Sequence, residues 1–486
     1  MSLSVRTAAA SLWMVGGRLL SKLIDFGALL ILARYLGPAE FGLVAIAMIS
    51  VQIVDMILEI PAAAAIGSLE RLTPDVVSTA FTIALLRALT IALLLGLLAF
   101  PMAKFYGEPR LAGLLVVLAL SPAMRGLSNP NLLVYSLKMD FRRDFAVDVL
   151  SKLIALLVSG IVAVLTRSYW ALAINAVAAT TSAAFISYLL GSRKVSLSLK
   201  EWRMFAPMMG WNSFAQIMQA VNWQLDRIVL PKFVSVASFG SYSNAANITS
   251  IPYQAIVQPV SRPLLVAFAT GSDPERLRAG YLRASYTLTA LVGPILVMVS
   301  VCALPIVEMV LGKAWISVAP ILFYMAMTSA FTLPVIPMTA LALSQGRANL
   351  ISAKTFAELM VKVPAVLFLV SRFGIAGALW AQAFSSTAMV LSSMILVRRL
   401  IDLKLSRQVL QLARPSASLA LLALIAHGVE SMLYGRVHVL IVLVAAGALG
   451  CSAYLGSMAL LWAISGRPDG PEAMLWSRVR KILAWS

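Results

Sequence analysis

The chain has 486 residues, of which 60% are hydrophobic and 12% are charged, and its mean hydropathy is +0.90. Soluble domains carry roughly 25% charged residues, so the composition excludes a soluble protein and predicts an integral membrane protein. The net charge of +19 suggests a nucleic-acid partner, but the positions of the basic residues argue for a membrane surface instead.

Apolar runs long enough to cross a bilayer, about 20 residues each, recur along the chain. The fourteen predicted spans cover residues 10–33, 42–66, 79–101, 111–133, 145–165, 168–190, 204–230, 238–263, 284–308, 316–343, 350–370, 374–397, 409–432 and 438–464. The connections are short, so no extramembrane domain is expected to carry enzyme chemistry. The first run is too long and too charged for a cleavable signal. The pattern predicts an all-α polytopic membrane protein.

The first span contains three charged residues on one helical face. Arg18, Lys22 and Asp25 are spaced i, i+4 and i+7, which aligns side chains along a helix. A charged side chain at bilayer depth costs about 2.5–3.5 kcal/mol on insertion scales. This face is therefore expected to look into protein or water, and the first span predicts a bundle with a polar interior.

Later spans carry comparable polar stripes. Their members are Gln52, Asp55 and Glu59 in span two, Arg125 in span four, Lys152 in span five, Asn212, Gln216, Gln219, Trp223 and Asp226 in span seven, Asn244, Asn247, Gln254, Gln258 and Arg262 in span eight, and Lys354, Glu358 and Lys362 in span eleven. Exposed to lipid, the basic and acidic residues within the spans would cost on the order of 20 kcal/mol or more. A hydrated central cavity would remove most of that cost.

Each of these residues also has a purely structural explanation. Arg87, Arg262 and Lys354 lie near predicted span ends, from which long cationic side chains snorkel to the interface. Asparagine and glutamine join helices by hydrogen bonds, and the i, i+4 steps of Lys354, Glu358 and Lys362 suit an ion-pair ladder. The sequence leaves both explanations open for single residues, whereas the whole set favours a cavity.

The basic residues outside the spans indicate the orientation. With the N-terminus inside, 22 lysines and arginines fall on the inner side and 8 on the outer side. Such a bias predicts that both termini are cytoplasmic, and it places the basic excess in short loops at a membrane face rather than on nucleic acid. The two cysteines, Cys302 and Cys451, lie far apart in apolar runs and are expected to be buried free thiols, with no disulfide or metal site.

An internal repeat relates the two halves of the chain. A shift of 198 residues aligns Phe41-Gly42 with Phe239-Gly240, and a shift of 205 aligns Gly107 with Gly312. Each half contains six predicted spans, an even number, so the halves have the same orientation, which is a parallel repeat.

The repeat predicts the domain organisation. An N-terminal six-helix lobe is expected at residues 1–195 and a second six-helix lobe at 196–400, followed by two additional membrane helices at 401–465. Residues 466–486 interleave apolar and basic side chains, which suits an amphipathic tail on the cytoplasmic membrane surface, with a merely solvated tail as the alternative.

Three stretches resemble bacterial polysaccharide transporters of the Wzx type. ILARYLGPAEFGLVAIA (31–47) is similar to their first hairpin, and WQLDRIVLPKFVSVASFGSYSNAANI (223–248) is similar to the segment that begins their second repeat. VLGKAWISVAPIL (310–322) resembles a further element of the family, with its glycine, tryptophan and proline. These transporters belong to the multidrug/oligosaccharidyl-lipid/polysaccharide exporter superfamily.

The resemblance implies a flippase for lipid-linked oligosaccharides. It implies two six-helix lobes around a central cationic cavity with two extra helices. The implied substrate is an undecaprenyl-diphosphate-linked repeat unit, moved across the bacterial inner membrane for exopolysaccharide or O-antigen (lipopolysaccharide) assembly by ion-coupled alternating access. The implied partners are this substrate, membrane lipids, a polysaccharide polymerase complex and a coupling ion, H+ or Na+, with no cofactor, metal or nucleic acid.

The expected site divides into two sets. The substrate-binding set comprises Arg18, Lys22, Arg125, Lys152, Asn212, Gln216, Gln219, Arg262, Lys354 and Lys362, because cations suit a diphosphate and amides suit a glycan. The ion-coupling or charge-pairing set comprises Asp25, Asp55, Glu59, Asp226 and Glu358. Asp55 and Glu59 are the expected titrating pair, unless they pair with Arg18 or Lys22 as structural links.

Three other functions are weighed against the flippase. A drug/cation antiporter of the same superfamily should favour an acidic, aromatic-lined cavity, whereas the charge within these spans is mainly basic. A membrane polymerase or glycosyltransferase needs catalytic carboxylates or histidines, usually with a large outer loop, and the sequence has only His427 and His438. A non-transporting scaffold of a polysaccharide assembly complex would have little use for a charged interior.

Overall fold

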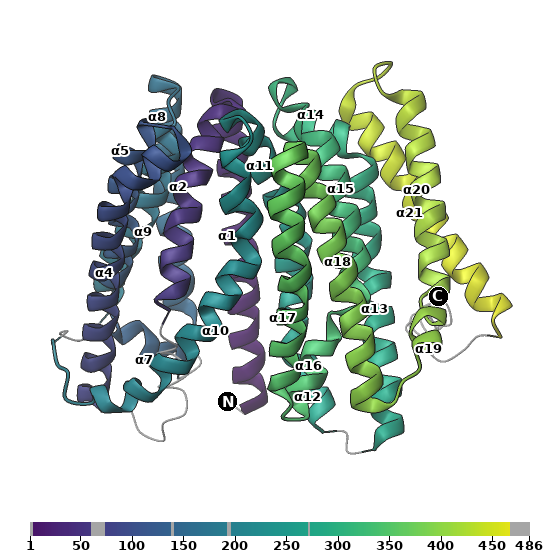
Figure 1. Cartoon of the computed structure of the whole chain (residues 1–486), viewed down its shortest axis with the longest axis horizontal. Helices are drawn as coiled ribbons and strands as arrows, with labels where there is room; N and C mark the ends of the chain where they lie inside the picture. Colours follow the sequence, from purple (N-terminus) through teal and green to yellow (C-terminus); the bar gives the residue numbers. More distant parts are fainter. Residues whose placement is uncertain (1–2, 60–72, 138–139, 192–195, 271–272, 467–486) are drawn as a thin grey trace. The chain divides into compact units, whose positions relative to one another are not determined.

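The computed structural model describes residues 3–59, 73–137, 140–191, 196–270 and 273–466. Every element within these ranges is helical (Figure 1), which confirms the predicted all-α class. Apart from its first residue, the predicted tail at 466–486 lies outside the described residues.

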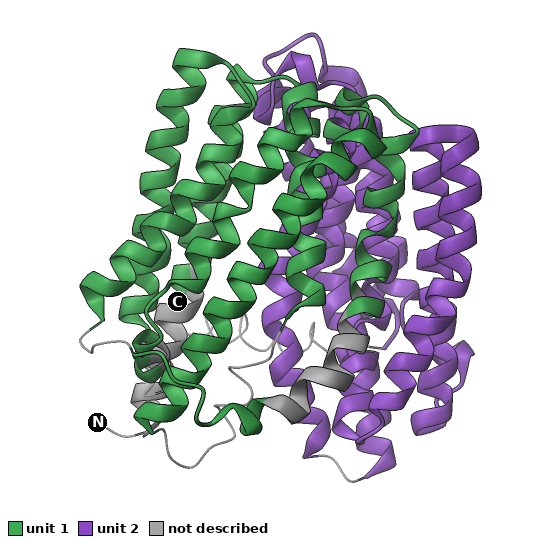
Figure 2. Cartoon of the chain, turned by 60° about the vertical axis from the view of Figure 1, so that its left-hand side comes forward, with its two compact units in different colours: residues 1–240 green, residues 241–486 purple. Residues whose placement is uncertain are grey.

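The chain divides into two compact units, Met1–Gly240 and Ser241–Ser486 (Figure 2). The helices of the first unit are α1 (Leu3–Tyr35), α2 (Pro38–Ile57), α4 (Pro74–Tyr106), α5 (Arg110–Leu118), α6 (Leu120–Gly126), α7 (Asn131–Leu137), α8 (Arg142–Thr166), α9 (Trp170–Leu190), α10 (Trp202–Val229) and η1 (Leu230–Lys232). α11 (Val236–Pro252) begins in the first unit and continues into the second.

The second unit continues with a π-helical turn and ends with two long helices. Its elements are η2 (Tyr253–Val257), α12 (Gln258–Ala269), α13 (Pro274–Val301), α14 (Ala303–Val310), η3 (Lys313–Trp315), α15 (Val318–Thr332), η4 (Leu333–Val335), α16 (Pro337–Ser344), α17 (Ala348–Ala365), η5 (Val366–Val370), α18 (Ser371–Ile401), α19 (Leu405–Leu410), α20 (Ala413–Leu433) and α21 (Val439–Ile464).

Nine stretches of the described residues are long and apolar enough to cross a membrane. They correspond to ten of the predicted spans, because the stretch Ala348–Ile401 joins spans eleven and twelve. The other four predicted spans are also helical, as α1, α5 to α7, α10 and α11 to α12. Span four is divided into three short helices, whereas spans one, seven and eight carry polar stripes.

Helix ends in the first unit follow local sequence signals. α2 begins after Gly37, whose backbone N–H donates to Glu40 at 3.0 Å, and Pro38 occupies the first helical turn. Thr73 caps α4 by accepting from the backbone N–H of Val76, and Gly107 ends α4 in the left-handed conformation. Gly312 of the second unit also has a positive φ, so both glycines that the repeat pairs adopt a backbone conformation that favours glycine.

Helix packing in the first unit brings charged helix faces together. α8 packs on both α9 and α1, while α4 packs on α5 and α6. α10 packs on α2, where Gln224 donates a hydrogen bond to Gln52 at 3.0 Å. Because α10 packs on α2, the first unit extends as far as Gly240; the lobe boundary that the repeat places at residue 195 stays a prediction.

In the second unit, α13 lies at the centre and contacts α15 and α20. α20 packs on α21, and α21 in turn contacts α14. Directly after α20, Tyr434 donates a hydrogen bond to Glu308 of α14 at 2.6 Å. This hydrogen bond, assisted by burial, raises the pKa of Tyr434 to about 12, so the phenol remains a donor at neutral pH.

Both cysteines are free thiols. Cys302 is buried at the end of α13, as expected. Cys451 is exposed, so the prediction that it is buried is wrong. It lies outside the buried face of α21, a distinction that apolar sequence alone does not reveal.

Candidate functional site

A three-residue ion cluster in the first unit links three helices through Asp55 of α2. Its Oδ1 lies 2.5 Å from the guanidinium of Arg87 on α4, and its Oδ2 lies 2.8 Å from that of Arg125 on α6. Arg87 also donates to the backbone oxygens of Asp55 and Leu58 at 2.8 and 2.7 Å. The cluster therefore carries one carboxylate and two guanidiniums.

Arg87 lies well inside its helix. It is the fourteenth residue of the 33-residue helix α4, which places it about 20 Å from the start of the helix. Asp55 supplies a protein partner for its guanidinium, and snorkelling from a span end stays an alternative prediction.

Arg125 is the accessible member of the cluster. Its side chain is 57% exposed, against 25% for Arg87 and 24% for Asp55. A guanidinium has five N–H donors in a planar fork, and the bond to Asp55 uses only one edge of it. Arg125 is thus held in place by Asp55 while it presents further donors outward.

A second charged cluster joins α1 and α8. Lys152 lies 3.0 Å from Asp25 and 3.8 Å from Asp148, while Lys22 lies 3.8 Å from Asp25. The hydroxyl of Ser21 donates to Asp148. Two lysines and two aspartates balance one another here, so the face of α1 that the sequence predicts to be polar contacts protein.

The two clusters contain five members of the predicted set, which are Lys22, Asp25, Asp55, Arg125 and Lys152. Gln52 of the same polar stripe as Asp55 accepts a hydrogen bond from Gln224, outside the clusters. The side chains of Arg18, Asn212, Gln216 and Gln219 lie outside the described part of the structure. Glu59 lies just beyond α2, and Asp226 lies in the last turn of α10.

The second unit holds the remaining predicted residues. Lys354 and Glu358 of α17 form an ion pair at 3.0 Å, with side chains only 11% and 10% exposed. This pair matches the first step of the predicted ladder, and Lys362 lies one turn further along the helix. Arg262 is exposed on α12.

From the sequence alone we predict no role for Asp148, and for Arg87 only a position near a span end. Asp148 and Lys152 are four residues apart at the start of an apolar run, a spacing that itself indicates a paired face. Arg87 has no such local signal, because its partner Asp55 is 32 residues away and only helix packing brings them together.

The described residues contain no group of three or more histidine, cysteine, aspartate or glutamate side chains placed to hold a metal ion. The chemistry that the two clusters offer is charge recognition by guanidinium and ammonium groups.

The comparisons with known proteins agree with a transport role. Residues 31–320 match the family described as polysaccharide biosynthesis protein. The succinoglycan biosynthesis transport protein ExoT of Rhizobium meliloti (strain 1021) is 28% identical over 335 residues, which cover 66% of each chain, just under two thirds of that relative's length. The lipopolysaccharide biosynthesis protein WzxC of Escherichia coli (strain K12) is 20% identical over 380 residues, or 76% of each chain.

A solved structure shares the fold. The lipid II flippase MurJ in an inward closed conformation superposes with a TM-score of 0.72 at 13% identity, covering 95% of this chain and 100% of that one. At this identity the likeness supports the all-helical fold alone. Because the family match covers more than half of the sequence, the chain belongs to the polysaccharide biosynthesis protein family, and its candidate spans make it a multi-pass membrane protein.

Proposed function

We propose that this transporter flips an undecaprenyl-diphosphate-linked oligosaccharide across the bacterial inner membrane for exopolysaccharide or O-antigen assembly. The names of the relatives ExoT and WzxC, which refer to succinoglycan transport and lipopolysaccharide biosynthesis, support this substrate class. The observation that carries the proposal is the cluster of Asp55, Arg87 and Arg125.

The chemistry of this cluster suits a diphosphate. Arginine binds phosphate oxygens through paired N–H groups, and such charge-assisted hydrogen bonds are about twice as strong as neutral ones. Asp55 neutralises one of the two guanidiniums, so the cluster keeps one positive charge while Arg125 is held in a fixed position. A substrate diphosphate would take up the remaining donors of Arg125.

The glycan part of the substrate needs neutral polar partners. The amide pair of Gln52 and Gln224 lies between α2 and α10 in the first unit. The predicted stripe of Asn212, Gln216 and Gln219 continues along α10 toward its N-terminus. We assign this stripe to the sugar hydroxyls, since amides both donate and accept hydrogen bonds.

The test uses purified protein in vesicles and a fluorescent undecaprenyl-diphosphate oligosaccharide. Arg125→Gln should lower the flipping rate about tenfold, the effect of losing one charge-assisted contact of the cluster. The matched control is Arg110→Gln, because Arg110 is similarly exposed and pairs with Glu108 outside the cluster. Equal rates for both variants and the parent would place the diphosphate elsewhere.

The same vesicles separate the alternative functions. A drug/cation antiporter would move a lipophilic cation and leave the glycolipid in place, and a scaffold would move neither. The basic excess of the Asp55 cluster favours an anionic substrate over a cationic one.

We also infer that transport is coupled to H+ or Na+ and that both termini are cytoplasmic. Carboxylates within spans are the natural carriers of such coupling, and Asp25, Asp55 and Glu59 remain the candidates. Delivery of the flipped unit to a polysaccharide polymerase complex is part of the same proposal.

A further inference from the structure

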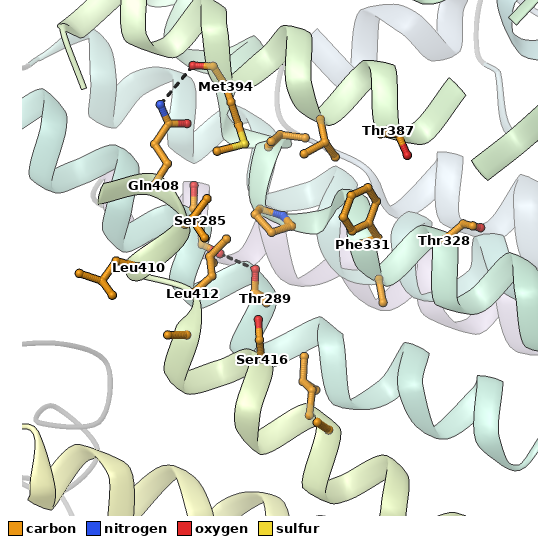
Figure 3. A pocket seen from close by; sticks show the side chains of 18 of the residues that line it. Ser285, Thr289, Thr328, Phe331, Thr387, Met394, Gln408, Leu410, Leu412 and Ser416 are labelled. Carbon is orange, nitrogen blue, oxygen red and sulfur yellow. Dashed lines mark hydrogen bonds between the residues drawn. The ribbon is translucent and has the colours of Figure 1, made fainter. Parts of the chain in front are cut away.

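A large cavity lies within the second unit, and none of its lining residues belongs to either ion cluster. Its volume is about 1140 Å³, and it is bounded by α13, α15, α18, α19 and the first half of α20 (Figure 3). Apolar side chains dominate its walls, among them Met327, Phe331, Val390, Leu410 and Leu419.

Several of the polar groups in the walls make hydrogen bonds within the protein. The hydroxyl of Thr289 donates to the carbonyl of Ser285 at 2.8 Å, and that of Thr328 donates to Tyr324 at 2.9 Å. The amide of Gln408 donates to the carbonyl of Met394 at 3.1 Å, as Figure 3 shows. A ligand in the cavity would therefore contact mainly apolar side chains and find few hydrogen-bond partners. Such walls favour an apolar ligand.

The cavity has the length of one membrane leaflet. Its lining runs along α13 from Tyr281 to Val297 and along α20 from Ala413 to Ala423. At 1.5 Å per residue these stretches measure about 24 and 15 Å, and one leaflet of hydrocarbon is about 15 Å thick. A fatty acyl chain of ordinary length lies within such a slot, whereas an undecaprenyl chain is several times longer than one leaflet.

One end of the cavity lies beside a group of exposed cations. The lining residues Met394, Ser406 and Gln408 belong to this end. Neighbouring positions on α18, on α19 and between these helices carry the exposed side chains Arg398, Arg399, Lys404 and Arg407. The acidic residue among them, Asp402, pairs with Arg278 at 3.6 Å. Beside Arg407, Val409 and Leu410 are 59% and 75% exposed, so an apolar entrance adjoins a basic rim.

We propose that this cavity binds one membrane phospholipid with an anionic headgroup. Its acyl chains fill the space between α13, α18 and α20, and its phosphate contacts the basic rim formed by Arg398, Arg399, Lys404 and Arg407. By the orientation that the charge bias predicts, this lipid belongs to the cytoplasmic leaflet. The site joins α19 and α20 to the body of the second unit, and it is separate from the residues assigned to the diphosphate.

The experiment measures the lipids that stay bound to the purified full-length protein. The protein is reconstituted in nanodiscs with equal phosphatidylglycerol and phosphatidylethanolamine, returned to detergent, washed, and analysed by native mass spectrometry. Retained phosphatidylglycerol should exceed phosphatidylethanolamine, and Ala420→Trp should lower its amount about tenfold by filling the slot. The matched control is Ala417→Trp, because Ala417 is exposed on the same helix outside the lining.

A second pair of variants tests the headgroup contact. Lys404→Gln/Arg407→Gln should reduce the preference for phosphatidylglycerol about fivefold or more, since each cation near a surface contributes to binding an anionic lipid. Arg436→Gln, an exposed cation after α20, should leave the preference unchanged. Retention of a polyprenyl lipid in place of phospholipid, equal binding of both phospholipids, or no effect of Ala420→Trp would overturn the proposal. None of these readouts depends on flipping.

Discussion

Asp55 divides its two carboxylate oxygens between two arginines, and its partners differ from those that the sequence suggested. Pairing with Arg18 or Lys22 of the first span was the expected structural alternative, whereas Arg87 and Arg125 occupy the two oxygens. Removal of the Asp55 carboxylate would leave the two guanidiniums facing each other. This loss of folding free energy is larger than the stabilisation that the intact cluster provides. The cluster is therefore both a link between α2, α4 and α6 and a holder for Arg125.

Asp55→Asn should destabilise the protein by about 1–3 kcal/mol, because Arg87 and Arg125 then repel each other without a carboxylate between them. Thermal unfolding in detergent, followed by tryptophan fluorescence, measures the effect. Asp75→Asn is the control, since Asp75 pairs with Lys200 at 3.7 Å on an exposed surface and should change little. Asp55→Asn/Arg125→Gln should recover part of the loss, and a double variant less stable than Asp55→Asn would contradict a repulsion between the arginines.

Residue spacing predicted helical faces well and side-chain partners poorly. The i, i+4, i+7 spacing of Arg18, Lys22 and Asp25 indicated one polar face on the first helix, because helical period fixes which residues align. It did not reveal that Asp25 pairs with Lys152, 127 residues later, at 3.0 Å. Partners across helices depend on packing and register, which no single sequence window contains.

At the scale of helices, the start of α2 and the start of α11 approach closely at Gly42 and Gly240, the two glycines that the repeat aligns. Each glycine lies against the backbone of the other helix. A Cβ at Gly42 would lie 1.9 Å from the carbonyl oxygen of Val236, and a Cβ at Gly240 would lie 1.9 Å from that of Pro38. The shift of 198 residues that aligns Gly42 with Gly240 also aligns Pro38 with Val236, so the two contacts are equivalent in the repeat. The start of α2 and the start of α11 therefore cross with their backbones touching, and only glycine allows this approach.

Gly42→Ala should destabilise the protein by about 1–3 kcal/mol, since the methyl group meets backbone that cannot move aside as a flexible side chain does. Thermal unfolding and the yield of folded protein in the membrane report the loss. Gly96→Ala is the matched control: Gly96 lies inside α4, where an added methyl group would have no neighbour within 4 Å, so alanine should be neutral or stabilising there. If Gly42→Ala unfolds at the temperature of Gly96→Ala, the close crossing is not required.

For the whole molecule, hydropathy located the spans because the bilayer imposes a length on every crossing segment. The same measure fails on α1, α10 and the helices α11 and α12, whose polar residues make them less apolar than the other spans although they are helical. The predicted span at 111–133 is broken into α5, α6 and α7, a division that apolar composition does not encode. The departure on α10 coincides with the amide stripe proposed for the glycan, whereas Asp55 and Arg87 lie on α2 and α4, which are apolar enough to count as spans.

The proposed coupling to an ion gradient would be a property of the whole molecule, and carboxylates within the predicted spans are the candidates for it. In the described structure Asp25 contacts Lys152 and Lys22, whereas Asp55 contacts the accessible Arg125. A substrate diphosphate on the outward donors of Arg125 would also compete with Oδ2 of Asp55 for that guanidinium. Its arrival would free this one oxygen for a proton or a sodium ion, while Arg87 keeps the other oxygen. This exchange links substrate binding to ion binding by direct charge competition.

Vesicles with an imposed pH or sodium gradient test this exchange. The parent protein should flip the fluorescent glycolipid faster with the gradient, whereas Asp55→Asn/Glu59→Gln should flip it at a rate that no longer responds. Asp75→Asn/Glu108→Gln makes the same chemical changes at carboxylates that pair with Lys200 and Arg110 outside the cluster, and it should respond like the parent. Competition for Arg125 requires the negative charge of Asp55. If the Asp55→Asn/Glu59→Gln protein folds and its flipping rate still rises with the gradient as that of the parent does, these carboxylates are not the coupling site.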